Sequence, residues 1–232
     1  MERAEKYSFC KTALSFVYPE RCDLCGCVVA PKKHVCRDCA KGLTRIPENH
    51  CFKCGRAKAD CSCTSAVRLY DGVCAPFRYS GSVREGLHKW KFTGYTDSST
   101  FFASNMVSTI KRDYNDISFD FITFIPQTKS GMEKRGYNQA KLLADIISVY
   151  LDIPVLDVLE KTFETPNQHD LAAILRSGNV LGAYEVKDGA SVKNKKILLI
   201  DDILTTGSVA SECAKMMLLG FAESVHVCVA AL

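Results

Sequence analysis

The segment that decides the fold is Lys196-Ile197-Leu198-Leu199-Ile200-Asp201-Asp202-Ile203-Leu204-Thr205-Thr206-Gly207-Ser208. Its first half is an aliphatic run typical of a buried strand. A helical pattern follows over residues 207–219, and Gly220 stands where a glycine commonly closes a helix. A buried strand that passes through a tight loop into a helix is typical of a parallel α/β sheet, where ligands bind at the carboxyl ends of the strands.

The loop at the end of this strand has the composition of a phosphate site. Backbone N–H groups, the threonine and serine hydroxyls and the positive end of the helix dipole could converge on an anion, and Gly207 permits close approach. The two aspartates before the loop would suit ribose hydroxyls or a magnesium ion. An ordinary strand-to-helix turn with an acidic cap is the alternative, and composition alone leaves it open.

The rest of the C-terminal part alternates between helix and strand patterns. Further strands are predicted at residues 119–125, 155–159 and 225–231. Asp97 or a following serine would cap one helix, and Asn138 stands at the cap position of another. The segment between Pro126 and Asn138 is interpreted as irregular, and residues 161–178 as a long polar loop. Together these patterns predict a parallel sheet flanked by helices over residues 67–232.

Cysteines set the N-terminal part apart. Ten of the thirteen fall in the first 63 residues. Eight of them form four close pairs: Cys22-Asp23-Leu24-Cys25, Cys36-Arg37-Asp38-Cys39, Cys51-Phe52-Lys53-Cys54 and Cys61-Ser62-Cys63. A two-residue gap lets both thiolates face one ion, so consecutive pairs predict two tetrahedral zinc sites. The ligands would be Cys22, Cys25, Cys36 and Cys39 in the first, and Cys51, Cys54, Cys61 and Cys63 in the second. We therefore expect an N-terminal helix or extension (1–20), a zinc-ribbon module (21–66) and the α/β domain (67–232).

Alternatives stay open for these cysteines. An iron–sulfur centre would use the same ligand type, whereas redox-active pairs need a thioredoxin-like context that the surrounding residues lack. Cys27, His34 and His50 are near enough in sequence to replace a ligand, and one or two ions could bind. A structural zinc would hold the fold together rather than do chemistry.

Composition constrains the environment more than the function. The chain has 47% hydrophobic and 24% charged residues, as expected of a folded globular protein. Its net charge of +4 is too small to indicate a partner. The short apolar stretch near Leu14 lacks the features of a secretory signal, and no apolar run is long enough to cross a membrane. With cysteines in a metal-binding pattern, these features predict a cytoplasmic protein without membrane insertion.

The phosphate-like loop resembles the signature with which type I phosphoribosyltransferases bind phosphoribosyl pyrophosphate (PRPP). This resemblance implies that the acidic pair holds the ribose hydroxyls and that the next polar positions wrap the 5-phosphate: Asp201 and Asp202 for the first role, Thr205, Thr206, Gly207 and Ser208 for the second. Val209 departs from the signature, which usually has a hydroxyl-bearing or small residue there.

Three further blocks are similar to the competence-associated ComF family, in which a cysteine ribbon precedes a transferase-like domain. The blocks are Leu87-His88-Lys89-Trp90-Lys91-Phe92-Thr93-Gly94, residues 126–139 with Arg135-Gly136-Tyr137-Asn138-Gln139, and residues 168–180. The resemblance implies that Arg135 and Lys91 contact the pyrophosphate. It also implies a mobile catalytic loop over residues 165–176, with Gln168 and Arg176. A solvated surface charge is the alternative for any single lysine.

The resemblance favours two functions. The first is a magnesium-dependent phosphoribosyltransferase, linked to DNA uptake in natural transformation, that displaces pyrophosphate from PRPP in favour of an unidentified nitrogen acceptor. The second is a non-catalytic PRPP sensor that binds single-stranded DNA, with Tyr137, Trp90 or Phe92 as stacking partners. The expected partners are PRPP, and for the second function single-stranded DNA and the uptake machinery. A cysteine-rich adaptor would leave the loop unexplained. A homodimer is open, since many proteins of this fold dimerise.

Overall fold

The computed structural model describes residues 19–61, 63, 68–93, 98–162 and 182–232. Three sets of predictions therefore lie outside the described residues: most of the N-terminal extension, the cap at Asp97, and the loop at 165–176 with Gln168 and Arg176.

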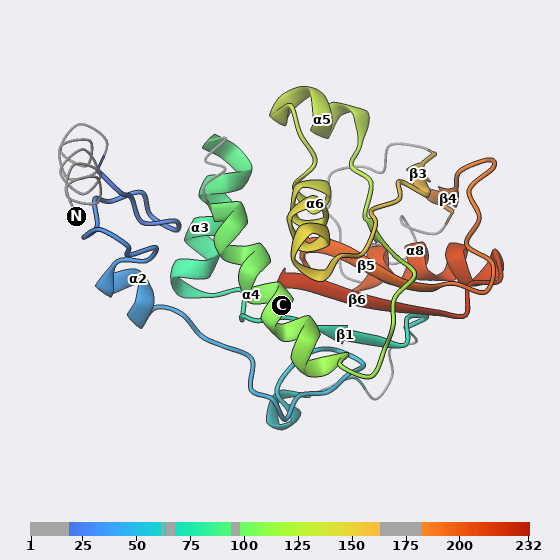
Figure 1. The fold of residues 1–232 in the computed structure, drawn as a ribbon, viewed down its shortest axis with the longest axis horizontal. Coiled ribbons are helices and arrows are strands. Elements are labelled where there is room, and N and C mark those ends of the chain that lie inside the picture. The colour runs from blue at the N-terminus through green and yellow to red at the C-terminus, as the bar shows by residue number, and fades with distance from the viewer. Residues whose placement is uncertain (1–18, 62, 64–67, 94–97, 163–181) are drawn as a thin grey trace, which may run out of the picture.

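A four-stranded parallel sheet forms the centre of the molecule (Figure 1). Its strands, in order across the sheet, are β1 (Gly72–Cys74), β6 (Ser224–Ala231), β5 (Lys196–Ile203) and β2 (Phe121–Phe124). Each neighbouring pair is parallel. The structure thus confirms the parallel sheet and the strands predicted around β2, β5 and β6.

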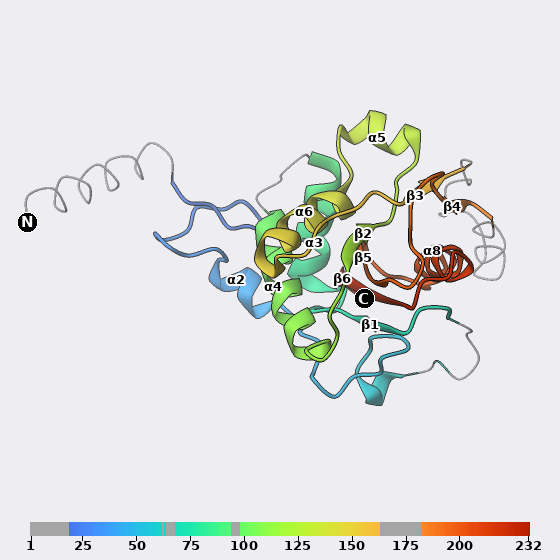
Figure 2. The same ribbon diagram turned by 45° about the vertical axis from the view of Figure 1, so that its right-hand side comes forward.

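Helices cover both faces of this sheet. α3 (Gly81–Thr93), α4 (Ser98–Asp113) and α6 (Gln139–Leu151) lie on one side and α8 (Ser208–Leu219) on the other, as Figure 2 shows. Successive residues of β5 alternate between the two cores: Leu198 and Ile200 pack with the first group of helices, and Ile197 and Leu199 pack with α8. A strand buried on both faces explains the unbroken aliphatic run.

The segment between Pro126 and Asn138 is a correction to the sequence interpretation. It contains a short helix, α5 (Lys129–Arg135), rather than irregular chain. Thr128 caps the N-terminus through a hydrogen bond of 2.9 Å from the Gly131 N–H to its Oγ1. Gly136 ends the helix in the left-handed conformation, with φ of 77°. Helix capping therefore outweighs the poor helix propensity of the glycine inside the segment.

The strand predicted at 155–159 is also placed differently. Val155 makes a single parallel bridge to Ile122. The regular strand β3 (Leu159–Lys161) begins four residues later and pairs antiparallel with β4 (Tyr184–Val186) in a separate two-stranded sheet. Other local predictions are confirmed: Asn138 caps α6 by accepting the Lys141 N–H, and Gly220 is the C-cap of α8.

The cysteine-rich part contacts the α/β domain at two places. The short helix α2 (Arg37–Lys41) lies beside α3, and the 3-10 turn η1 (Lys58–Asp60) lies below β1 in the view of Figure 2. Cys36 caps α2 by accepting the Cys39 N–H on its sulfur. Two separate attachments therefore hold this part against the sheet and its helices.

Candidate phosphate-binding site and cysteine centres

The loop between β5 and α8 presents a group of unpaired N–H donors. Gly207 is the N-cap of α8 and has φ of 79° and ψ of 4°. Within the described chain, the backbone N–H groups of Thr205, Thr206 and Gly207 donate to no acceptor. The Oγ1 of Thr206 lies 2.9 Å from the Oγ of Ser208 and accepts the Ser208 N–H at 3.3 Å. Clustered backbone donors at a helix N-terminus, beside two hydroxyls, are suited to bind an anion.

The acidic pair stands at the carboxyl end of β5, directly before this loop. The Asp201 Oδ1 accepts the Asp202 N–H, and the Asp202 Oδ1 accepts the Ile203 N–H, both at 2.8 Å. Burial raises the pKa of Asp201 well above its ordinary value, and the charge of Asp202 raises it further. The charge of Lys91 acts in the opposite direction. Lys91, predicted from the sequence as a site residue, is therefore within electrostatic reach of Asp201.

Arg135 occupies a fixed position beyond the end of β2. It is the last residue of α5, and its Nη1 donates to the Oε1 atoms of Gln127 and Gln139 at 3.4 and 3.3 Å. Both glutamines lie beside the carboxyl edge of the sheet, one after β2 and one at the start of α6. Two side-chain amides therefore hold the Arg135 guanidinium beside this edge of the sheet.

A hydrogen bond at Trp90 connects the segment that carries Lys91 with the segment that carries Arg135. The Tyr137 hydroxyl donates to the Trp90 carbonyl at 2.9 Å, which joins the chain after α5 to the last turn of α3. The indole of Trp90 is only 1% exposed and stacks on Phe102 in the core, so it cannot stack on a nucleotide base. Phe92, at 65% exposure, remains accessible. Of the aromatic residues proposed for single-stranded DNA, Trp90 is thus a core residue.

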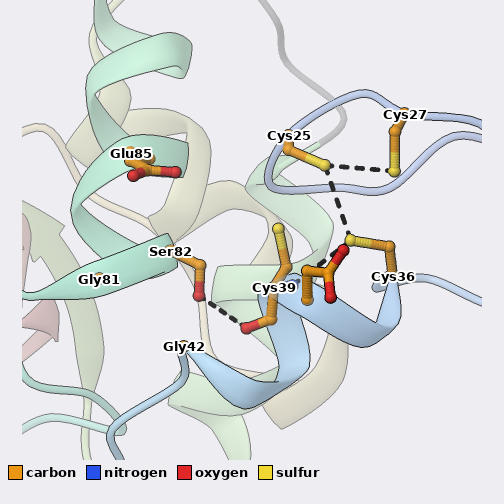
Figure 3. Close-up of a pocket in the computed structure, with 9 residues that line it drawn as sticks. Cys25, Cys27, Cys36, Cys39, Gly42, Gly81, Ser82 and Glu85 are labelled. Atoms are coloured by element: carbon orange, nitrogen blue, oxygen red, sulfur yellow. Dashed lines mark hydrogen bonds between the residues drawn. The ribbon is translucent and has the colours of Figure 1, made fainter.

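The first cysteine cluster contains the predicted ligands. The sulfur atoms of Cys22, Cys25, Cys36 and Cys39 all lie within 4.8 Å of one another. Figure 3 shows Cys25 and Cys36 facing each other, with Cys27 hydrogen-bonded to the Cys25 sulfur at 3.3 Å. The cluster is attached to α3, because Ser82 donates to the Cys39 carbonyl at 2.7 Å and Lys89 to the Cys25 carbonyl at 2.6 Å.

The second cluster also has the predicted composition: Cys51, Cys54, Cys61 and Cys63, again within 4.8 Å of one another. It is attached to the sheet by a hydrogen bond of 2.8 Å from the Val73 N–H in β1 to the Phe52 carbonyl. His50 is not in the ligand group: it is buried, with its Nδ1 near the Glu48 carbonyl and its Nε2 3.5 Å from Asp113. Four thiols at these separations fit one tetrahedral zinc ion in each cluster, as expected of closed structural sites.

None of the helices in the described part of the chain has the length and apolar composition that a membrane crossing requires.

Comparisons with known proteins identify a domain family in the N-terminal part and relatives over most of the chain. A family model described as a double zinc ribbon domain matches residues 13–75. Competence protein ComFC of Bacillus subtilis is 26% identical over 82% of this chain and 80% of its own length. ComFC of Streptococcus pneumoniae is 29% identical, over 79% and 80%. The DNA utilization protein YhgH of Escherichia coli is 23% identical over 94% of this chain and 92% of its own. The chain is a homologue of ComFC and YhgH. The resemblance to the ComF family is confirmed.

Solved structures resemble this chain more distantly. The glutamine PRPP amidotransferase of B. subtilis is 17% identical and matches 65% of this chain but 28% of its own, with a TM-score of 0.37. Purine phosphoribosyltransferase of Pyrococcus horikoshii is 12% identical over 55% of this chain and 70% of its own, with a TM-score of 0.35. At these scores neither structure carries an argument about function.

Proposed function

We propose that this chain binds PRPP at the carboxyl edge of its sheet, transfers the ribose 5-phosphate, and acts in DNA uptake. The observation that carries the proposal is the set of unpaired N–H groups in the loop at Thr205, Thr206 and Gly207, directly after two carboxylates. The link to DNA uptake comes from relatives named as competence and DNA utilization proteins.

Each part of PRPP would have a complementary group in this arrangement. The loop would take the 5-phosphate, because its free donors and the α8 dipole favour a dianion. The acidic pair would take the ribose hydroxyls, which donate to carboxylate oxygens. Burial and mutual repulsion make the free pair unfavourable, as the raised pKa of Asp201 indicates. Hydroxyl donors or a cation would relieve that repulsion on binding.

Magnesium would fit the same edge. Carboxylate oxygens are the ligands it prefers, and Asp201 and Asp202 supply them together with oxygens of the substrate. A bound Mg²⁺ would neutralise part of the pyrophosphate charge.

The reaction would be a displacement at C1 of the ribose. A nitrogen acceptor forms the C1–N bond while the C1–O bond breaks, the electron pair leaves with pyrophosphate, and the acceptor's proton passes to solvent. Lys91 and Arg135 would stabilise the charge that develops on the leaving group. Because the two glutamines hold its guanidinium in advance, Arg135 would need little reorganisation.

Calorimetry with PRPP and Mg²⁺ on the zinc-loaded chain tests this proposal. We expect binding in the unaltered protein and its loss in the double variant Asp201→Asn, Asp202→Asn. The exposed Asp188→Asn is the matched control and should bind normally. Pyrophosphate release in the presence of amine and base acceptors separates a transferase from a PRPP sensor. If the unaltered protein binds no PRPP but binds single-stranded DNA, the proposed function is wrong.

A further inference from the structure

We infer that Arg68 is a positioning residue that couples the second cysteine centre to the phosphate-binding loop, so that zinc at that centre raises the affinity of the loop for PRPP. This inference rests on the proposed function. It concerns a residue outside the PRPP signature and a metal centre outside the sheet. The evidence is a set of contacts between segments that are far apart in the sequence.

Arg68 joins the two sites directly. Its Nη1 donates to the Lys53 carbonyl at 3.2 Å, and its Nη2 donates to the Thr206 carbonyl at 3.5 Å. Lys53 lies between Cys51 and Cys54, inside the turn that supplies two thiols of the second cluster. One guanidinium therefore bridges a metal-binding turn and the loop, although Arg68 and Thr206 are 138 positions apart in the sequence.

The residues after Arg68 strengthen this connection. The Tyr70 hydroxyl also donates to the Lys53 carbonyl, at 3.2 Å. The Leu69 N–H donates to the Ser211 Oγ at 3.0 Å, which ties the same segment to the first turn of α8. Three consecutive residues thus contact the cysteine turn on one side and the start of the helix on the other.

The hydrogen bond from Arg68 to the Thr206 carbonyl determines where the Gly207 N–H points. A trans peptide is planar, so the Thr206 carbonyl and the Gly207 N–H point in opposite directions. With the carbonyl directed to Arg68, the Gly207 N–H points away from Arg68, and it is one of the unpaired donors of the loop. Rotation of this peptide would turn a carbonyl oxygen towards the bound phosphate and repel it. Arg68 therefore stabilises the peptide orientation that an anion requires.

Zinc is part of this inference because a bound ion would fix the cysteine turn that accepts the other hydrogen bond of Arg68. The position of the Lys53 carbonyl depends on the turn between Cys51 and Cys54, and a bound ion holds such a turn in one geometry. The first cluster lacks this connection among the described residues: its hydrogen bonds with the α/β domain lead to α3 and α4, through Ser82, Lys89 and Ser98. Only the second centre should therefore be coupled to the loop. Coupling between two binding sites is reciprocal, so PRPP should also retain that zinc ion.

The test compares the zinc-loaded full chain with its Arg68→Met variant. Calorimetry with PRPP and Mg²⁺ should show binding at least about tenfold weaker in the variant, the loss expected when hydrogen bonds from a charged donor are removed. A colorimetric chelator then measures zinc release with and without PRPP. In the unaltered chain, PRPP should slow the release of one of the zinc ions. In Arg68→Met this protection should disappear, although the initial zinc content is unchanged.

Arg21→Met is the matched control, because the Arg21 Nη1 donates to a carbonyl of the first cysteine turn, that of Gly26, at 3.0 Å. It should keep both PRPP affinity and zinc protection. Normal PRPP binding by Arg68→Met, or zinc release that PRPP does not slow in the unaltered chain, overturns the coupling and leaves the proposed function intact. No PRPP binding by the unaltered chain overturns the proposed function, and this inference with it. If Arg68→Met does not fold, Tyr70→Phe removes a single hydroxyl donor to Lys53 and should reduce the protection.

Discussion

Alanine at position 207 would disturb the phosphate-binding loop in two ways that can be measured separately. Gly207 has φ of 79°, and the left-handed region costs an L-residue about 1–2 kcal/mol. A Cβ at this position would also lie 3.1 Å from the Tyr70 hydroxyl and 3.2 Å from the Arg68 Nε. Both of these side chains donate hydrogen bonds to the Lys53 carbonyl, so the shift of a few tenths of an ångström that a Cβ requires would strain those bonds.

Gly189 provides the control for the backbone effect. It has the same φ of 79°, but a Cβ added there would meet no atom within 4 Å. Gly189→Ala should therefore show the backbone cost alone, about 1–2 kcal/mol by urea denaturation, with normal PRPP binding. Gly207→Ala should lose more stability than Gly189→Ala and bind PRPP at least about tenfold more weakly, because displacement of Arg68 also releases the Thr206 carbonyl.

The comparison has a clear refuting result. If the two variants lose equal stability and bind PRPP equally well, the close approach of Arg68 and Tyr70 to Gly207 has no energetic consequence. Arg68 and Tyr70 would then not maintain the loop conformation at Gly207. The inferred coupling between the second cysteine centre and PRPP binding would lose its physical basis.

Two further predictions concern the first cysteine centre and the acidic pair. Leu24 is 1% exposed and packs against Gly86 of α3, so Leu24→Ala should reduce the free energy of unfolding by about 2–5 kcal/mol in urea denaturation. Val28→Ala, at a side chain that is 59% exposed, should change it by no more than about 0.5 kcal/mol; an equal effect of both would contradict the packing of this turn on α3. Asp201→Asn should raise the melting temperature of the unliganded protein near neutral pH and not at low pH. The folded-state pKa of Asp201 is raised, so stability present below the ordinary Asp pKa, about 3.9, is lost as pH rises through the raised value. Melting curves across this pH range measure whether Asp201→Asn raises or lowers the melting temperature. A variant less stable than the unaltered protein at neutral pH would contradict the prediction.

The parts of the fold that could be predicted from the sequence are those determined by local pattern. The aliphatic run of β5 and the cap at Asn138 depend on residues within a few positions, and the structure has both. The two cysteine groups follow from pair spacing alone. The sequence pattern of α5 is typical of irregular chain, because Gly131 and several charged residues obscure the caps at Thr128 and Gly136.

Features that depend on distant partners could not be predicted in this way. β1 has three residues, begins with glycine and exists only because it pairs with β6, more than 150 positions later. Arg68 carries no local signal either. It follows the cysteine pairs in a segment without a motif, and its contacts become evident only when Lys53 and Thr206 are brought together.

The cost of ionising Asp201 in the free protein favours a binding site over a structural turn. The Asp201 carboxyl group lies at the end of a largely apolar strand, next to a second carboxylate. Within the described residues it interacts with Asp202, through the N–H and the side chain of that residue. Ionisation of Asp201 therefore lowers the stability of the free protein. A capping role would require one acidic side chain at the helix N-terminus, and Gly207 fills the N-cap position instead. The ionised pair is therefore unfavourable for folding in the free protein, and hydroxyl groups or a cation would relieve that cost. Such a loss of stability is typical of functional sites, where local stability is lower than the fold would allow.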